Sequence, residues 1–203
     1  MALIRDAAVF LDKDGTLIDD VPYNVDPNRM RLAPGSRSGL RRLHERGFRL
    51  VVVSNQSGVA RGYFTEDALR DVEERLRDLL RAFGVPLAGF YYCPHDPLGR
   101  VKRYATDCTC RKPRPGLLQR AARDGHFDLT HSWCVGDILD DIEAGCAAHC
   151  RTVLIDNGNE TKWQLSDRRV PDYIARNLDE AADFIIDATG PGRPVRPHST
   201  ARP

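Results

Sequence analysis

Short apolar runs alternate with longer amphipathic segments along most of this chain. The apolar runs have the length and the β-branched or aromatic content of buried strands, and they lie at residues 8–12, 48–53, 89–92, 132–136, 151–156 and 171–175. The amphipathic segments repeat apolar residues at helical spacing, and they lie at residues 35–46, 65–83, 115–123, 142–148 and 178–188. Strands that alternate with helices form parallel βαβ units, so the pattern predicts an α/β fold with a doubly wound parallel sheet of about six strands.

Two segments interrupt this alternation. Residues 19–34 are polar and contain three prolines, which predicts an irregular flap over the mouth of a site at the end of the first strand. Within this flap, Tyr23, Asn24 and Asp26 either contact a substrate or only form turns. Residues 190–203 contain four prolines and three arginines without any periodicity, which predicts a disordered tail.

Composition narrows the class of protein. The 203 residues are 41% hydrophobic and 29% charged, as expected for one globular domain, which we place at residues 1–189. The net charge of +1 provides no field that would attract nucleic acid, and no apolar run approaches the roughly 18 residues of a membrane span. The opening residues lack a signal-peptide pattern. We therefore expect a cytoplasmic monomer with neither nucleic-acid nor membrane partners.

Four potential metal ligands occur within residues 93–110, a segment that we call the Cys/His loop. Cys93 and His95 form a Cys-x-His pair, and twelve residues later Cys108 and Cys110 form a Cys-x-Cys pair. Three thiols and one imidazole match a closed, structural zinc site, and unconnected thiols are the alternative. A reducing compartment keeps thiols free for metals. Buried free thiols are the expectation for the other cysteines, which are Cys134, Cys146 and Cys150.

The first predicted strand ends in two carboxylates, Asp12 and Asp14, followed by Gly15 and Thr16. Ligands of open α/β sheets bind outside the carboxyl ends of the strands, so two acids at this position favour a divalent cation. Asp12 can be both a hard oxygen ligand for Mg²⁺ and a nucleophile, and Asp14 can serve as acid and base. The alternative is a polar turn with a helix cap.

Further polar groups follow the other predicted strands or lie at the start of the next element: Ser54, Lys112, Asp137, Asp140 and Asp141. The residues after the second strand are small and polar, which predicts a loop whose amides and hydroxyl face an anion. The lysine follows the Cys/His loop directly, so a metal there would fix the segment that carries this lysine. Carboxylates at a second strand end strengthen the prediction of a cation site.

These groups resemble, in their order along the chain, the four motifs of the haloacid dehalogenase superfamily of phosphohydrolases. The matching features are Asp-x-Asp-Gly-Thr, the hydroxyl after the second strand, the lysine, and Gly-Asp-x-x-x-Asp. The resemblance implies that Mg²⁺ is held by Asp12, Asp137 and the backbone carbonyl of Asp14, with Thr16 in a supporting role. It also implies a Rossmann-like sheet.

The resemblance further implies a mechanism through an aspartyl-phosphate. Asp12 attacks phosphorus, and Asp14 protonates the leaving alkoxide and later takes a proton from water. Lys112 and Ser54 hold the transferring oxygens. Asp141 orients this lysine or a water on the metal; Asp140 is the alternative, although the spacing favours Asp141.

Three other segments make the resemblance more specific: the residues Ser54–Gly62, the Cys-x-His and Cys-x-Cys pairs, and Cys110-Arg111-Lys112-Pro113. They are similar to those of the D-glycero-D-manno-heptose 1,7-bisphosphate 7-phosphatases and the histidinol-phosphate phosphatases. The match covers about residues 8–156. That group has no cap domain, and its zinc loop replaces part of one. Many relatives carry lysine where this chain has Ile138, so this chain lacks one of the cations that those relatives place near the phosphate.

The resemblance implies a small phosphorylated sugar as substrate, most simply the 7-phosphate group of heptose 1,7-bisphosphate, with histidinol phosphate or another small phosphomonoester as the alternative. The residues expected to bind it are Asn55, Gln56, Arg61 and Arg111. Arg61, Arg111 and Lys112 place three cations near one rim of the predicted phosphate site. A second phosphate on the substrate would explain why the site has so many cations. Alternatively, Arg61 faces solvent or pairs with an acid.

Two functions of other kinds fit the sequence less well. A phospho-receiver domain also combines a parallel sheet with an acidic pair, a hydroxyl and a lysine, but its phosphorylated aspartate ends the third strand. Here Cys93 occupies that position. A nucleic-acid 3′-phosphatase would need a basic surface, which the net charge of +1 does not provide.

Overall fold

The computed structural model describes residues 6–189 and gathers their strands into one sheet. The strands are β1 (Ala8–Leu11), β2 (Arg49–Asn55), β3 (Leu87–Cys93), β4 (Trp133–Gly136), β5 (Arg151–Ile155) and β6 (Tyr173–Ala175). Their spatial order is β3-β2-β1-β4-β5-β6, and every neighbouring pair is parallel. The predicted parallel sheet of six strands is confirmed. The predicted disordered tail lies outside the described residues.

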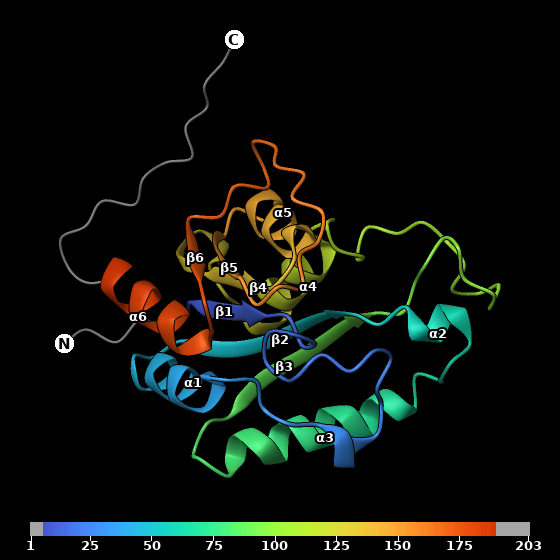
Figure 1. Cartoon of the computed structure of the whole chain (residues 1–203), viewed down its shortest axis with the longest axis horizontal. Helices are drawn as coiled ribbons and strands as arrows, with labels where there is room; N and C mark the ends of the chain where they lie inside the picture. Colours follow the sequence, from blue (N-terminus) through green and yellow to red (C-terminus); the bar gives the residue numbers. More distant parts are fainter. Residues whose placement is uncertain (1–5, 190–203) are drawn as a thin grey trace.

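Helices cover both faces of this sheet (Figure 1). They are α1 (Ser36–Glu45), α2 (Gly58–Arg61), α3 (Ala68–Arg81), α4 (Gly116–Gly125), α5 (Leu139–Ala147) and α6 (Leu178–Ala188). One hydrophobic cluster joins the sheet to α1, α3 and α6, and a second joins it to α4 and α5. The fold is therefore a three-layer α/β/α sandwich, as expected for a Rossmann-like sheet.

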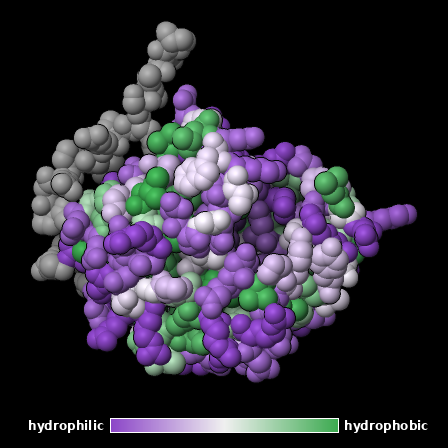
Figure 2. Space-filling model, in the orientation of Figure 1, coloured by the Kyte–Doolittle hydropathy of each residue, from purple (hydrophilic) through white to green (hydrophobic). Residues whose placement is uncertain are grey.

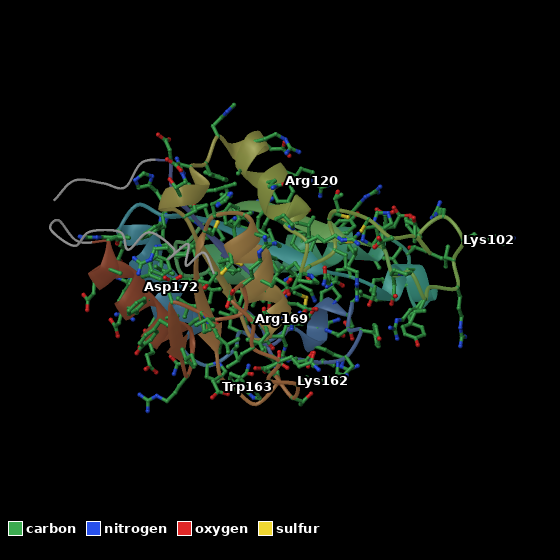
Figure 3. All side chains as sticks on the ribbon, turned by 90° about the horizontal axis from the view of Figure 1, so that it is seen from above. Lys102, Arg120, Lys162, Trp163, Arg169 and Asp172 are labelled. Atoms are coloured by element: carbon green, nitrogen blue, oxygen red, sulfur yellow. The ribbon has the colours of Figure 1, made fainter. Side chains whose placement is uncertain are left out.

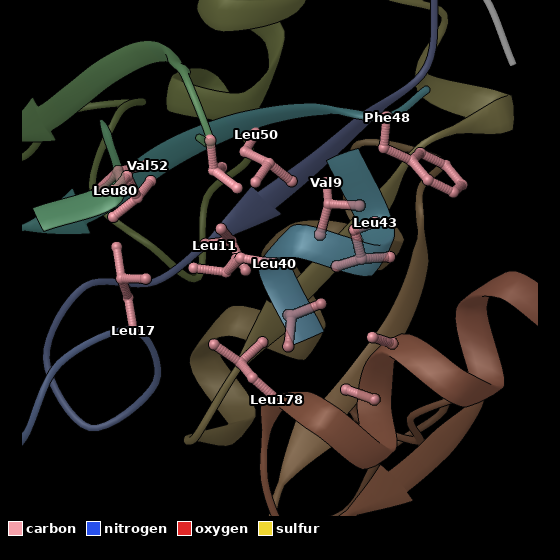
Figure 4. Close-up of a cluster of buried hydrophobic side chains, with 14 of the residues drawn as sticks. Val9, Leu11, Leu17, Leu40, Leu43, Phe48, Leu50, Val52, Leu80 and Leu178 are labelled. Carbon is pink, nitrogen blue, oxygen red and sulfur yellow. The ribbon is translucent and has the colours of Figure 1, made fainter. Parts of the chain in front are cut away.

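The alternation of side chains along β1 explains why both faces are covered. Val9 and Leu11 enter the larger cluster, whereas Ala8 and Phe10 enter the smaller one, and all four are fully buried. Figure 4 shows the larger cluster, in which side chains of β1 and β2 meet leucines from α1 and α6. A strand that is apolar on both faces is typical of a parallel sheet with a helical layer on each side.

Several boundaries differ from the sequence pattern. The helix expected at residues 142–148 begins earlier, at Leu139, so that Asp140 and Asp141 lie in its first turn. Carboxylates are favourable there because unpaired N–H groups give a helix N-terminus a partial positive charge. The loop expected after Ser54 contains one helical turn, α2, and the long helix is shorter than residues 65–83. The flap is irregular apart from one 3₁₀ turn, Pro27–Arg29.

The strand order fixes where a ligand can bind. The chain leaves β1 for β2 on one side of it and returns later to β4 on the other side. Between strands whose connections diverge in this way, a crevice opens at the carboxyl ends. The residue that follows β1, Asp12, donates its N–H to the carbonyl of Val135 in β4 at 2.9 Å, so the two strand ends are in register.

Most of the molecular face shown in Figure 2 is hydrophilic, and its hydrophobic residues form separate small patches. The large apolar side chains that are exposed include Tyr63, Leu98 and Leu165. Within residues 6–189, none of the helices combines the length and apolar character needed to cross a membrane.

Candidate active site

A cavity of about 230 Å³ lies at the carboxyl ends of β1, β2 and β4. Its lining is almost entirely polar: Asp12, Asp14, Asp20, Ser54, Asn55, Lys112, Asp137, Ile138, Asp141 and Asn159. Seven of these residues are ones that the strand-end motifs singled out as site residues. The crevice predicted by the strand order therefore contains the groups that the sequence marks for chemistry.

Lys112 lines this cavity and is buried between two carboxylates. Its Nζ lies 2.5 Å from Asp12 Oδ1 and 2.6 Å from Asp141 Oδ1, and it also donates to the carbonyl of Val53 at 2.9 Å. Only 2% of the lysine side chain and 1% of that of Asp141 are exposed. Burial opposes the charge, but the two carboxylates outweigh it and raise the pKa of Lys112, so the lysine stays positively charged.

Asn55 positions the backbone of this lysine. The Asn55 side chain donates to the Lys112 carbonyl at 3.1 Å and accepts from the Lys112 N–H at 3.0 Å. The lysine follows a long loop, and the paired amide contacts join that loop to the end of β2. The structure thus shows Asn55, expected as a substrate-binding residue, in a bond to protein backbone.

Asp14 is held by two side chains on either side of its carboxylate. Lys13 Nζ lies 2.5 Å from Oδ1, and Gln56 Nε2 donates to Oδ2 at 3.2 Å. The same Gln56 nitrogen donates to Ser54 Oγ at 2.8 Å, which joins the first and second motifs. Burial raises the pKa of Asp14 above its usual range, and Lys13 partly offsets this effect.

Asp137, after β4, faces Asp12 across the crevice. Thr16 Oγ1 donates to its Oδ1 at 3.1 Å, and Asn159 Nδ2 donates to its Oδ2 at 2.7 Å. Burial, together with the neighbouring Asp12 carboxylate, raises the pKa of Asp137 to about 6. Gly15 is required beside it, since a Cβ there would lie 2.2 Å from Asp137 Oδ2. Gly15 also adopts a φ of +79°, which favours glycine.

The two acids of the α5 first turn have different partners. Asp141 lies against Lys112, whereas Asp140 points away and pairs with Arg169 at 2.6 Å. Of the two alternatives left open by the sequence, the structure places Asp141 next to the lysine.

The two arginines expected to bind substrate are engaged by the Cys/His loop. Arg61 Nε donates to Asp96 Oδ2 at 2.9 Å, and Arg111 Nη1 donates to the carbonyl of His95 at 3.2 Å. Neither arginine is among the described residues that line the 230 Å³ cavity. The acid-pair alternative for Arg61 is thus what the structure shows, and its guanidinium also lies 5.8 Å from the ring centre of Tyr23.

The flap contributes one aromatic ring, Tyr23, and one carboxylate, Asp20. Tyr23 packs edge-on against Tyr63, with ring centres 4.7 Å apart, and both rings are about half exposed. Asn24 and Asp26 make only turn contacts with the flap backbone. Asp20, in contrast, lines the cavity, which residue spacing alone did not indicate.

The four ligand candidates of the Cys/His loop converge. One donor atom from each of Cys93, His95, Cys108 and Cys110 lies within 4.8 Å of the others, and the Cys110 sulfur is 3.1 Å from Cys93 and 3.3 Å from Cys108. All three thiols are free. Tetrahedral zinc with bonds of about 2.3 Å separates its sulfur ligands by roughly 3.8 Å, so the cluster has nearly the required size.

The remaining cysteines are also free thiols. Cys134 and Cys150 are buried, as expected, but Cys146 on α5 is only half-buried.

Sequence reasoning missed several residues of the site. Lys13 was overlooked because it stands between two motif positions. Asn157 and Asn159 follow β5, and the rule used for the other strands, polar residues at a strand end, would have pointed to them. Asn157 Nδ2 donates to the carbonyl of Gly15 at 2.6 Å.

Comparison with known proteins identifies the family. The family model described as HAD-hydrolase-like matches residues 109–181. The D-glycero-β-D-manno-heptose-1,7-bisphosphate 7-phosphatase of Escherichia coli is 43% identical over 182 residues, which covers 89% of this chain and 88% of that protein. The enzyme of the same name from Pasteurella multocida is 43% identical over 152 residues, or 74% of this chain and 82% of that protein. The chain belongs to the HAD-like phosphatases.

Solved structures agree with this assignment. A putative HAD-like phosphatase from Mesorhizobium loti has a TM-score of 0.78 at 33% identity, covering 90% of this chain and 85% of that protein. The D,D-heptose 1,7-bisphosphate phosphatase of B. bronchiseptica, complexed with magnesium and phosphate, has a TM-score of 0.76 at 30% identity, covering 89% and 98% of the two chains. This HAD-like phosphatase is therefore an enzyme that hydrolyses phosphomonoesters.

The buried contacts of Lys112 generate a stability prediction. Lys112→Met should lower the free energy of unfolding by about 3 kcal/mol, because it leaves two buried carboxylates without their cation. Urea unfolding followed by circular dichroism measures this change. Arg41→Met is the matched control, since its partner Glu45 is exposed, and it should cost at most about 0.5 kcal/mol. Equal effects of the two substitutions would contradict the prediction.

Proposed function

We propose that this phosphatase removes the 7-phosphate of D-glycero-D-manno-heptose 1,7-bisphosphate. The observation that carries the proposal is the 43% identity to the E. coli enzyme of that name over 88% of its length. The geometry supports it, because Asp12, Lys112 and Asp137 meet in one polar cavity at the carboxyl end of the sheet.

The donor set of the cavity fits Mg²⁺. Carboxylate oxygens of Asp12 and Asp137 lie within 4.8 Å of each other, and such hard oxygen donors are the ligands that Mg²⁺ prefers. Asp141 belongs to the same group of acids, but only 1% of its side chain is exposed, compared with 12% of that of Asp12. We assign Asp12, Asp137 and the backbone carbonyl of Asp14 as the ligands. When bound there, Mg²⁺ would reduce the repulsion between a carboxylate and a phosphate dianion.

The reaction uses the two acids of the first motif in sequence. A carboxylate oxygen of Asp12 attacks phosphorus, the bond to the sugar oxygen breaks, and Asp14 gives its proton to the leaving alkoxide. Water then attacks the aspartyl-phosphate, Asp14 takes a proton from that water, and phosphate and free Asp12 are regenerated. The contacts of Asp14 with Lys13 and Gln56 fix the orientation of its carboxylate for both proton transfers.

Lys112 and Ser54 stabilise the oxygens of the transferring phosphoryl group. Lys112 is positively charged and already within 2.5 Å of the Asp12 carboxylate, so its charge lies beside the attacking oxygen. Ser54 is buried and receives a hydrogen bond from Gln56, which leaves its own hydroxyl proton for a phosphate oxygen. Asp141 orients the lysine.

We also propose that the Cys/His loop binds one structural zinc ion. Its three sulfurs and one imidazole nitrogen converge without forming a disulfide, which fits this ion and leaves no open coordination position. The ion would fix the loop from within. From outside, the loop is anchored by Asp96 to Arg61 and by the N–H of Val101 to the carbonyl of Ala60 at 2.9 Å.

The balance of charges near Arg61 and Arg111 supports a bisphosphate as the substrate. Lys112 is neutralised by Asp12 and Asp141, so it does not count toward a second phosphate. Arg61 donates to Asp96, and Arg111 donates to the carbonyl of the preceding residue, His95. Burial acts to raise the pKa of Asp96, but its hydrogen bonds with the Leu98 N–H and Arg61, together with the charge of Arg111, lower it. Two arginines against one acid leave about one net positive charge for the 1-phosphate. That the enzyme is cytoplasmic and monomeric remains a prediction from the sequence.

Asp12→Asn should abolish turnover of heptose 1,7-bisphosphate without unfolding the protein. The amide has the same shape but cannot form the aspartyl-phosphate. Phosphate release measures the effect, with Asp71→Asn, an exposed acid of α3, as the control that retains activity. Activity of Asp12→Asn within tenfold of the wild type would remove Asp12 as the nucleophile.

Purified protein should contain about one zinc ion per chain, as measured by elemental analysis. Cys108→Ser should lose most of this zinc, raise KM and lower kcat, because Arg111 and Lys112 follow the Cys/His loop directly. Cys146→Ser is the matched control and should retain the metal, since Cys146 lies on α5. Active wild-type protein without zinc would contradict the proposed site.

The wild-type enzyme should prefer heptose 1,7-bisphosphate over heptose 7-phosphate in kcat/KM. Arg111→Ala should reduce this preference by acting mainly on the doubly phosphorylated sugar, because it removes one cation at the rim. Arg81→Ala is the control: this arginine pairs with Asp78 on the exposed face of α3. Equal kcat/KM for the two sugars, or a preference for histidinol phosphate, would overturn the substrate assignment.

A further inference from the structure

Asp137 receives its side-chain hydrogen bonds from two neutral groups. Asn159 Nδ2 donates to Oδ2 at 2.7 Å, and Thr16 Oγ1 donates to Oδ1 at 3.1 Å. Each oxygen of an ionised carboxylate has about two lone-pair sites, so one donor on each leaves both oxygens able to bind a cation. The two donors therefore fix the plane of the carboxylate without saturating it.

Asn159 is itself held in place by its neighbours. Its N–H donates to Asn157 Oδ1 at 3.1 Å, and Asn157 Nδ2 donates to the carbonyl of Gly15 at 2.6 Å. A Cβ added at Gly15 would lie 2.4 Å from Asn159 Nδ2 and 2.2 Å from Asp137 Oδ2, so these three residues are closely packed. The loop after β5 thus joins the turn after β1 to the carboxylate after β4.

The same loop is attached to α5 at both of its ends. Glu160 Oε2 accepts from the N–H of Leu139, the first residue of α5, at 2.8 Å. At the far end, Arg169 pairs with two carboxylates of α5 at 2.6 Å each. Figure 3 shows Lys162 and Trp163 near the outer edge of this connection and Arg169 closer to the body of the molecule. These contacts hold the backbone around Asn159 against the element that follows Asp137.

We propose that Asn159 is a positioning residue that holds Asp137 in the orientation required to bind the catalytic cation. This inference rests on the proposed Mg²⁺ site. Hydrogen bonds from outside the ligand set orient metal ligands, and their loss typically weakens metal binding by a factor of 10 to about 100. Asn159 suits this role because it is neutral: a lysine would compete with the cation for Asp137, and an acid would repel its carboxylate.

Two variants test the proposal by metal binding rather than by turnover. Asn159→Ala removes the amide donor, and Asn159→Leu removes it while keeping a similar side-chain volume. The free Mn²⁺ signal in electron paramagnetic resonance gives the Kd of the purified protein for Mn²⁺, and Mg²⁺ is titrated in competition. Thr161→Ala is the matched control, since Thr161 is exposed on the same connection.

Both Asn159 variants should bind Mn²⁺ about tenfold more weakly than the wild type and the Thr161→Ala control. The Mg²⁺ concentration for half-maximal phosphate release should rise by the same factor, with kcat and KM near wild type at saturating Mg²⁺. Wild-type Mn²⁺ affinity in both variants would overturn the inference. If wild-type protein binds Mn²⁺ but does not hydrolyse heptose 1,7-bisphosphate, the substrate proposal fails and the binding comparison still decides the role of Asn159. If it binds neither metal, the cation site and this inference both fail.

Discussion

The buried ion cluster formed by Lys112, Asp12 and Asp141 is the interaction on which the active site depends. Charges removed from water are costly unless each has a partner, and here one ammonium lies within 2.6 Å of two carboxylates. The cluster joins three elements that are distant in sequence: the end of β1, the first turn of α5 and the segment after the Cys/His loop. Its geometry therefore requires all three to be in place.

The Cys/His loop helps to position Lys112. The last of its four potential ligands, Cys110, precedes Lys112 by two residues, and the Asn55 amide holds the backbone of that lysine from the side of β2. The described residues contain no cap domain that could close over the substrate, and the zinc ion that we propose in the Cys/His loop would make this loop rigid without a second domain. Arg61 and Arg111 are organised by this same rim through Asp96 and the His95 carbonyl.

Asp137 depends on a second support, on the opposite side of the cavity. The loop after β5 supplies an amide to its carboxylate and a second amide to the carbonyl of Gly15, so the turns after β1 and β4 are joined through a third strand end. The strand order places β1, β4 and β5 side by side, which brings these three ends together. One support thus holds the lysine proposed to face the phosphate, and the other holds a carboxylate proposed to bind the cation.

The sequence by itself determined the sheet, its helical layers and the polar groups at the strand ends that we propose to be catalytic, because apolar periodicity and the residue after each strand are local properties. It did not determine the partners of those groups. Arg61 pairs with Asp96, Asp141 rather than Asp140 contacts Lys112, and Asn159 donates to Asp137. The two residues of each pair are 22 to 35 positions apart in the sequence. Such contacts follow from the strand order and the side-chain rotamers, which only the tertiary structure decides.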